Sequence, residues 1–155
     1  MIGNDVVDIT LATKQSNWRR KGYLDKLFTA HEQACIYSSP NPDVMAWTLW
    51  SMKEAAYKIY NRQTGERGFF PLRLVCNITG SMGTVTCNDN LYYTQTEIKD
   101  NLIHTVAVSD ITHFGSVTTL SDVVITKDTA GLPYVADKPV SVSHHGRGYK
   151  VVGLT

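Results

Sequence analysis

The chain contains 155 residues, which is the length of a single domain. Hydrophobic residues make up 43% of it and charged residues 19%, a balance that supports a sizeable buried core and excludes an intrinsically disordered chain. Fifteen basic residues stand against fourteen acidic ones, and the resulting net charge of +1 excludes a strongly basic nucleic-acid-binding protein.

The first half of the chain predicts a strand followed by helices. The strand is expected over residues 2–9, and the helices over 17–27, 30–37 and 43–61. Thr29 and Glu32 have the spacing of a capping box, in which each side chain bonds the other residue's backbone N–H, so a helix should begin there. The long last helix carries apolar residues at helical spacing and should end before Gly65.

The second half is typical of an antiparallel sheet. The strand-like segments are 71–78, 83–87, 91–98, 102–109, 140–143 and 149–153. A turn is expected at residues 131–133, residues 144–148 should connect the last two strands, and residues 117–127 fit either a strand or a helical turn. We therefore expect an α+β fold, one domain over residues 1–155 with N-terminal helices packed on an antiparallel sheet.

Membrane and disulfide signals are missing from the sequence. No apolar run approaches the roughly 20 residues that cross a bilayer, and the N-terminus has no signal-peptide pattern. The three cysteines form no C-x-x-C pair, which argues against a disulfide framework and a structural zinc site. We therefore expect a cytoplasmic protein with neither a membrane nor a nucleic acid as partner.

Two acidic residues of the first strand are candidates for a site. Asp5 and Asp8 are three residues apart, so in a regular strand they point to opposite faces and cannot serve one site together. Asp5 also follows Gly3 and Asn4, which leaves two interpretations open. It is either a turn cap at the start of the strand or a functional carboxylate.

The long helix carries a second candidate pair. Glu54 and Lys58 are four residues apart and share one helix face, where a surface ion pair contributes only about 0.3–0.5 kcal/mol. Trp47 and Trp50 lie on the same side, so Glu54 is a poor fit for a freely solvated face. Glu54 and Asp5 together could supply oxygen ligands to Mg²⁺, which takes one or two protein carboxylates plus phosphate oxygens and water.

Two further features each allow two interpretations. Glu32 is either a structural helix cap or a catalytic carboxylate. The segment Ser141–Tyr149 contains small hydroxyls, two histidines, an arginine and two glycines, a composition that suits an anion site with open backbone amides. The other interpretation of this segment is a hairpin turn with histidines on its rim.

Five spaced segments together resemble the 4′-phosphopantetheinyl transferase superfamily. They are Gly3-Asn4-Asp5-Val6 (G-x-D-[IV]), Phe28-Thr29-Ala30-His31-Glu32 (F-[ST]-x-x-E), Trp50-Ser51-Met52-Lys53-Glu54-Ala55-Ala56-Tyr57-Lys58 (W-[ST]-x-K-E-[AS]-x-x-K), Gly131-Leu132-Pro133 (G-[KQ]-P) and Ser141-Val142-Ser143-His144 (S-[IL]-S-H). Residues 111–128 match nothing in that pattern. The resemblance implies the α+β fold of these enzymes.

The resemblance also implies a Mg²⁺-dependent transferase. Such enzymes move the 4′-phosphopantetheine arm of coenzyme A onto a serine hydroxyl of an apo acyl or peptidyl carrier protein and release adenosine 3′,5′-bisphosphate. By motif position, Asp5 and Glu54 would hold Mg²⁺, Glu54 or Glu32 would be the base, and Lys58 would face the phosphates. The remaining contacts to coenzyme A would come from Gly131, Pro133, Ser143, His144 and Arg147, the last inferred from charge and position alone.

The motif order resembles the holo-acyl-carrier-protein synthase branch, whose short chains form trimers with active sites between subunits. We therefore expect a homo-oligomer, and the branch favours a trimer. The alternative is a monomer whose own C-terminal segment completes the site. The other branch has an acid two residues after the metal-binding Asp; here that residue is Val7, so the sequence does not identify a third metal ligand.

The alternative function is a catalytically inactive module that binds coenzyme A or a carrier protein. A phosphohydrolase is disfavoured because acidic ligands are sparse.

The near-zero net charge hides an uneven distribution. Residues 14–26 contain five basic residues against Asp25 alone, a local charge of +4, and the rest of the chain sums to −3. The carrier proteins implied by the resemblance are acidic, and opposite charges speed encounter and set orientation. We therefore predict Arg19, Arg20 and Lys21 as carrier-docking residues, with a solvated helix face as the alternative.

Overall fold

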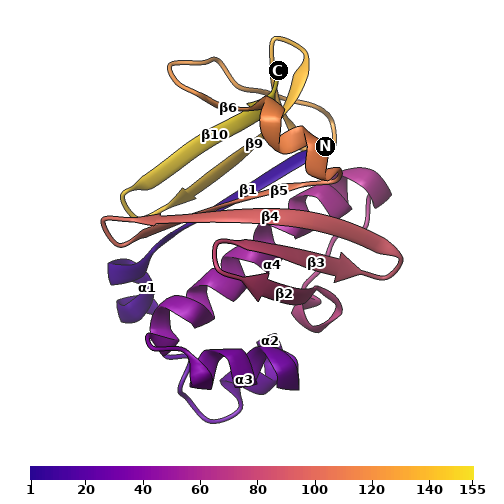
Figure 1. The fold of residues 1–155 in the computed structure, drawn as a ribbon. Helices are drawn as coiled ribbons and strands as arrows, with labels where there is room; N and C mark the ends of the chain where they lie inside the picture. Colours follow the sequence, from indigo (N-terminus) through magenta and orange to yellow (C-terminus); the bar gives the residue numbers. More distant parts are fainter.

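The computed structural model describes residues 1–155 and places a long helix, α4, against the first of two antiparallel sheets (Figure 1). In Figure 1, α4 runs diagonally behind the first sheet, and the second sheet adjoins β1 at the far edge. The helices are α1 Ile9–Gln15, α2 Tyr23–Leu27, α3 Ala30–Ser38 and α4 Pro42–Thr64, with 3₁₀ turns η1 Pro71–Arg73 and η2 Ile111–Ser116. None of them is both long and apolar enough to cross a membrane.

Each sheet contains five strands, and every paired strand runs antiparallel. The first has the order β1-β5-β4-β3-β2, with β1 Ile2–Asp8, β2 Val75–Thr79, β3 Met82–Cys87, β4 Asn90–Lys99 and β5 Leu102–Val108. The second has the order β6-β10-β9-β8-β7, with β6 Val117–Leu120, β7 Thr126–Lys127, β8 Pro133–Val135, β9 Lys138–His145 and β10 Gly148–Leu154. The predicted α+β fold is confirmed.

The long helix begins and ends where local chemistry predicts. The Asn41 side chain accepts from Val44 N at the start of α4, and Pro42 occupies the first turn, where its missing N–H costs nothing. Gly65 ends the helix with φ +75°, a conformation that other residues rarely adopt. The helix predicted over 43–61 is therefore confirmed and extends to Thr64.

Two predicted elements are wrong at their N-terminal ends. The helix predicted over 17–27 is helical only from Tyr23, because Gly22 has φ +81° and the preceding residues form turns. The strand predicted over 71–78 begins only at Val75, because Pro71–Arg73 close a 3₁₀ turn. The positive charges at residues 19–21 therefore lie on a turn rather than on a helix.

Two connections also differ from the prediction. An unpredicted helix, α1, follows β1 directly because the Asp8 side chain caps it by accepting from Leu11 N. The predicted connection over 144–148 shrinks to Gly146 and Arg147, since β9 continues to His145 and β10 begins at Gly148. His145 therefore belongs to a regular strand, and its side chain has a defined direction.

Close packing of β1 on α4 places the N-terminal strand beside the helix that carries Glu54. The main core cluster includes Met52, Ala55 and Ile59 of α4, each fully buried. At Gly3 the backbone of the helix leaves no room for a side chain, because an added Cβ would collide with Ala55 O. The chain two residues further along therefore faces the same helix.

Candidate active site

β1 is the edge strand of the first sheet. The N–H groups on its outer edge are hydrogen-bonded by side chains of β9 and not by the backbone of a further strand. Three alternate N–H groups of β1 donate to three alternate side chains of β9: Asn4 N to Ser141 Oγ (2.8 Å), Val6 N to Ser143 Oγ (2.9 Å) and Asp8 N to His145 Nδ1 (2.9 Å). Because side chains alternate along a strand, these acceptors share the face of β9 that meets β1. We call this set of contacts the β1–β9 seam.

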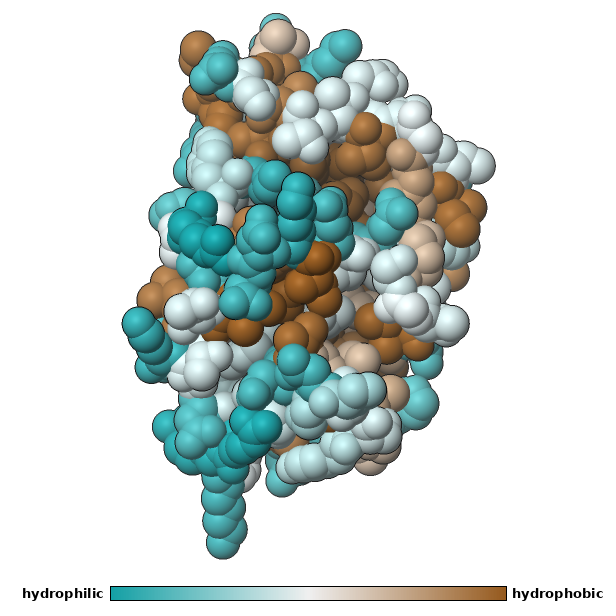
Figure 2. All heavy atoms as spheres, turned by 60° about the vertical axis from the view of Figure 1, so that its left-hand side comes forward, coloured by the Kyte–Doolittle hydropathy of each residue, from teal (hydrophilic) through white to brown (hydrophobic).

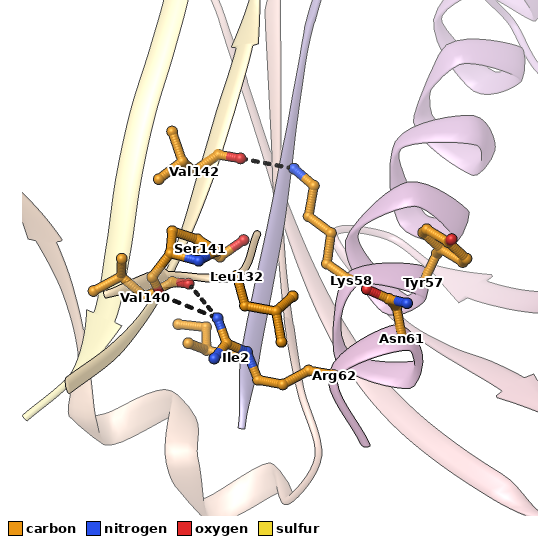
Figure 3. Close-up of a pocket in the computed structure, with 10 residues that line it drawn as sticks. Ile2, Tyr57, Lys58, Asn61, Arg62, Leu132, Val140, Ser141 and Val142 are labelled. Carbon is orange, nitrogen blue, oxygen red and sulfur yellow. Dashed lines mark hydrogen bonds between the residues drawn. The ribbon is translucent and has the colours of Figure 1, made fainter. Parts of the chain in front are cut away.

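Lys58 reaches the seam from α4. Its Nζ donates to Asn4 O (2.6 Å) and to Val142 O (2.9 Å), so one ammonium group joins a carbonyl of each strand. Figure 3 shows this side chain extending from the helix to the carbonyl of Val142. Burial lowers the pKa of Lys58, and the charges of Asp5 and Glu54 oppose that lowering. The ammonium group and the two carboxylates therefore act on one another electrostatically.

Asp5 lies in the middle of β1 and faces α4, so its interpretation as a turn cap is wrong. Its Oδ1 accepts from Ser143 Oγ (3.3 Å), and Ser51 Oγ of the helix lies 3.4 Å from its backbone oxygen. Burial raises the pKa of Asp5 to about 7; Lys58 opposes the rise and Glu54 adds to it. Burial also raises the pKa of Glu54, again opposed by Lys58. The charge of Lys58 therefore offsets only part of the effect of burial on the two carboxylates.

The opposite-face prediction for Asp5 and Asp8 is confirmed. While Asp5 faces α4, the Asp8 carboxylate accepts from Leu11 N (3.3 Å) and Arg147 N (3.2 Å). These backbone hydrogen bonds, led by the one from Arg147, lower the pKa of Asp8. Asp8 is therefore a structural carboxylate that ties the start of α1 to the β9–β10 turn.

The donors around Asp5 fit a magnesium ion bound together with a phosphate. No group of three or more His, Cys, Asp and Glu side chains in the protein could form a complete metal site. Two carboxylates, Asp5 and Glu54, match Mg²⁺, which commonly completes its shell with phosphate oxygens and water. Burial raises the pKa of both carboxylates, and the charge of Lys58 opposes that rise in each. Val7, at the position of the third ligand, is buried in the core.

A cavity of about 140 Å³ lies between the second half of α4 and β9 (Figure 3). It carries two cationic side chains and no carboxylate; its lining residues are Ile2, Tyr57, Lys58, Asn61, Arg62, Leu132, Pro133, Val140, Ser141 and Val142. Pro133 thus lines this cavity, while Gly131, with φ +80°, shapes the turn that precedes it. The cavity is suited to an anionic group.

Arg62 supplies the second charge of this cavity. Its Nη2 donates to Pro133 O (3.1 Å) and Val140 O (3.2 Å), which anchors β8 and β9 to the helix. Its Nη1 is buried and has no hydrogen-bond partner. A buried donor without an acceptor is costly, so this atom favours an acceptor supplied from outside the chain.

A second cavity, of about 200 Å³, lies on the other side of Tyr57 and includes Glu54. Its lining includes the aromatic side chains of Trp50, Phe69 and Phe70. Phe69 is 72% exposed, and its ring centroid lies 6.2 Å from that of Trp50. Glu54 therefore shares a cavity with aromatic side chains and is also under the influence of the Lys58 charge.

Glu32 is a buried structural residue. The capping box with Thr29 is present, and Glu32 Oε1 also lies 2.8 Å from Lys53 Nζ, with both side chains 1% exposed. Glu32 Oε2 accepts from Cys76 N (2.7 Å), while Lys53 Nζ donates to two carbonyl groups between α4 and β2. The structure thus favours the cap over the catalytic role, because the carboxylate is saturated and inaccessible.

The predicted phosphate contacts of the C-terminal segment are not gathered at one place. Ser143 lies in the seam beside Asp5, whereas His144 is exposed on the opposite face of β9 with its ring against Tyr149. Arg147 is exposed in the next turn and lines a separate cavity of about 260 Å³. In one chain, therefore, neither His144 nor Arg147 reaches the cavity of Lys58.

The predicted docking residues are exposed on the turn before α2. Arg19 pairs with Asp43 (2.6 Å) and lies 4.2 Å from the centroid of the Trp18 ring. Arg20 and Lys21 are exposed beside it. Asp43 therefore neutralises part of the positive charge that the sequence places here.

Some residues of the site were missed at the level of sequence. Arg62 follows Lys58 by four residues, and this spacing alone would have placed both on one face of the helix. Ser141 and His145 flank Ser143 at a spacing of two, which puts all three on one face of a strand. The signal for His145 was hidden by the prediction of a turn at that position.

The comparisons with known proteins agree with this geometry. A family model described as the 4′-phosphopantetheinyl transferase superfamily matches residues 1–109, which include Asp5, Glu54 and Lys58. The chain therefore belongs to this superfamily, and the resemblance predicted from its motifs is confirmed.

A curated relative provides a more specific similarity. The holo-[acyl-carrier-protein] synthase of Verminephrobacter eiseniae (strain EF01-2) is 37% identical over 59 residues. The aligned region covers 38% of this chain and 45% of the relative, so the match spans less than half of the relative's length.

Proposed function

We propose that the protein transfers the 4′-phosphopantetheine moiety of coenzyme A to a serine hydroxyl of an apo acyl or peptidyl carrier protein, with Mg²⁺, and releases adenosine 3′,5′-bisphosphate. The observation that carries this proposal is the pair Asp5 and Glu54 beside a cavity with two cations and no acid. The reaction needs both parts, because a pyrophosphate bond is broken and negative charge develops on the leaving group.

Each residue has a role that its surroundings support. Asp5 and Glu54 would hold Mg²⁺, which when bound would neutralise charge on the pyrophosphate. Glu54 would accept the proton of the attacking serine, directly or through water, since its raised pKa suits a base and Glu32 has no access to substrate. Lys58 and Arg62 would offer N–H donors to the leaving phosphate.

The direct test is incubation with coenzyme A, MgCl₂ and several apo carrier proteins, followed by intact mass spectrometry. We expect the carrier to gain the mass of one phosphopantetheine group with the wild-type protein and none with Glu54→Gln. Glu97→Gln, at an exposed position on β4, is the matched control and should retain transfer. Binding of coenzyme A without any mass gain would instead support the inactive binding module.

Carrier docking is proposed for the turn that contains Arg19, Arg20 and Lys21. These side chains are exposed, and Arg20 and Lys21 form no ion pair that would neutralise them. Reversing both charges, Arg20→Glu with Lys21→Glu, should slow carrier modification and flatten its dependence on salt. An unchanged salt dependence would remove this turn from the docking surface.

A homo-oligomer is proposed because the surface of one chain leaves apolar groups exposed. Figure 2 shows hydrophobic atoms between hydrophilic ones on the face that lies to the left in Figure 1. Exposed apolar side chains include Phe69, Val124 and Tyr149. In such an oligomer, His144 and Arg147 would contribute to the active site of a partner subunit. Light scattering after gel filtration should give a trimer mass; a fully active monomer would contradict this proposal.

A further inference from the structure

Two serines of the β1–β9 seam have the same chemistry but different neighbours. Ser141 and Ser143 are both buried, 3% and 6% exposed, and each accepts from a backbone N–H of β1 at 2.8 or 2.9 Å. Only Ser143 also has a carboxylate within reach, Asp5 Oδ1 at 3.3 Å. The two positions therefore separate a seam contact that has no carboxylate partner from one that also reaches Asp5.

The hydrogen-bonding capacity of Ser143 is committed on both sides. A hydroxyl has one hydrogen to donate and lone pairs to accept. Val6 N donates to the lone pairs and fixes the position of Oγ, which leaves the single hydrogen for Asp5 Oδ1. The backbone N–H of Val6 thus fixes the position of the Ser143 hydroxyl, and this hydroxyl in turn donates to the carboxylate of Asp5.

The other groups that act on the Asp5 carboxylate by charge or hydrogen bonding come from α4. They are Ser51, Glu54 and Lys58, of which Glu54 repels the charge of Asp5 and Lys58 attracts it. The Asp5 carboxylate is partly buried, and a hydrogen bond from outside this helix restricts its rotamer. β9 provides that contact from 138 residues along the chain.

We propose that Ser143 is a positioning residue that fixes the rotamer of the Asp5 carboxylate for binding a divalent cation; this proposal rests on the proposed function. It differs from the role implied by the family resemblance, in which Ser143 contacts the phosphates of coenzyme A. The hydroxyl hydrogen that would serve a phosphate is instead directed at Asp5. Substrate phosphate then has the cavity of Lys58 and Arg62 as its site.

The test compares Ser143→Ala with its matched control Ser141→Ala. Binding of Mn²⁺ is measured by calorimetry and by electron paramagnetic resonance, with thermal unfolding recorded for each variant. Both substitutions remove one seam hydrogen bond, so both should lower Tm by a similar amount. Ser143→Ala should weaken Mn²⁺ binding at least fivefold, Ser141→Ala less than twofold, and Ser143→Thr should restore most of the affinity. Equal Mn²⁺ affinity in the two alanine variants would overturn the proposal.

Crystal structures of the two alanine variants provide a readout that needs no cation. We expect the Asp5 side chain to change rotamer in Ser143→Ala and to stay in place in Ser141→Ala. An unmoved Asp5 in Ser143→Ala would overturn the positioning role even if transfer were lost. A moved Asp5 in a protein whose wild type binds no Mn²⁺ would support positioning and reject the metal site of the proposed function.

Discussion

The carbonyl oxygen of Ala55 occupies the place where a side chain at Gly3 would begin. This contact lets the backbone of β1 lie directly on α4. Asp5, two residues along the same face of the strand, is thereby held against the turn of the helix that carries Glu54 and Lys58. The glycine of the G-x-D segment is thus required for packing, and its effect on the site is indirect.

Gly3→Ala should therefore destabilise the protein severely. The added methyl group would meet backbone and not a flexible side chain, so the strand and the helix must separate. We expect a loss of at least about 3 kcal/mol in the free energy of unfolding, measured by urea denaturation. Gly115→Ala is the control, because a Cβ there meets nothing within 4 Å. Equal stability of the two variants would show that β1 can retreat at little cost.

Lys53→Met should leave the buried carboxyl group of Glu32 without its cationic partner. Removing one partner of a buried ion pair costs about 3–5 kcal/mol, since the other charge loses its compensation. The double variant Glu32→Gln with Lys53→Met should recover part of that loss. Chemical denaturation of the three proteins checks this order of stabilities. A Lys53→Met variant as stable as the wild type would show that the pair contributes nothing.

Asp5→Asn should stabilise the protein at pH 8 while abolishing transfer. The pKa of Asp5 rises from 3.8 to about 7 on folding, so between these values the folded chain binds the extra proton. Stability is then lost as the pH rises from about 4 to about 7. Asparagine removes this penalty, and we expect a gain of about 1–3 kcal/mol at pH 8 and little change at pH 4. Urea denaturation at both pH values, without divalent cations, measures the difference; equal stability at pH 8 would contradict it.

Arg62→Gln should weaken binding of coenzyme A about tenfold, because one charge-assisted contact to phosphate is lost. Titration calorimetry with coenzyme A and with 3′-dephospho-coenzyme A would identify the phosphate concerned. A loss for both ligands points to the pyrophosphate, and a loss for coenzyme A alone points to the 3′-phosphate. Lys26→Gln, on α2 and exposed, is the charge control. Unchanged affinity in folded Arg62→Gln would exclude Arg62 from the site.

The sequence was informative where local chemistry decides the structure. The capping box of Thr29 and Glu32, the ends of α4 and the alternation of Asp5 and Asp8 all follow from rules that act within a few residues. Five spaced segments together, of which the one containing Glu54 is the most specific, predicted the family.

Contacts between distant segments could not be predicted in the same way. The seam joins residues 137 positions apart, and nothing in the segment around Ser141 shows that its hydroxyls accept from β1 and not from a ligand. Lys53 was part of a recognised motif, yet its burial against Glu32 depends on how α3 packs on α4. Tertiary packing, which a local pattern does not encode, decided these roles.

The seam also has a consequence for how the protein is made. β1 is translated before β9, and its N–H groups at Asn4, Val6 and Asp8 have no protein acceptor in the seam until residues 141–145 have been added. During that interval β1 is an uncovered sheet edge, which invites pairing with other chains. Nascent chains halted before β9 should therefore aggregate more readily than chains halted after it. The Asp5 side chain can form its hydrogen bond with Ser143 only once Ser143 has left the ribosome.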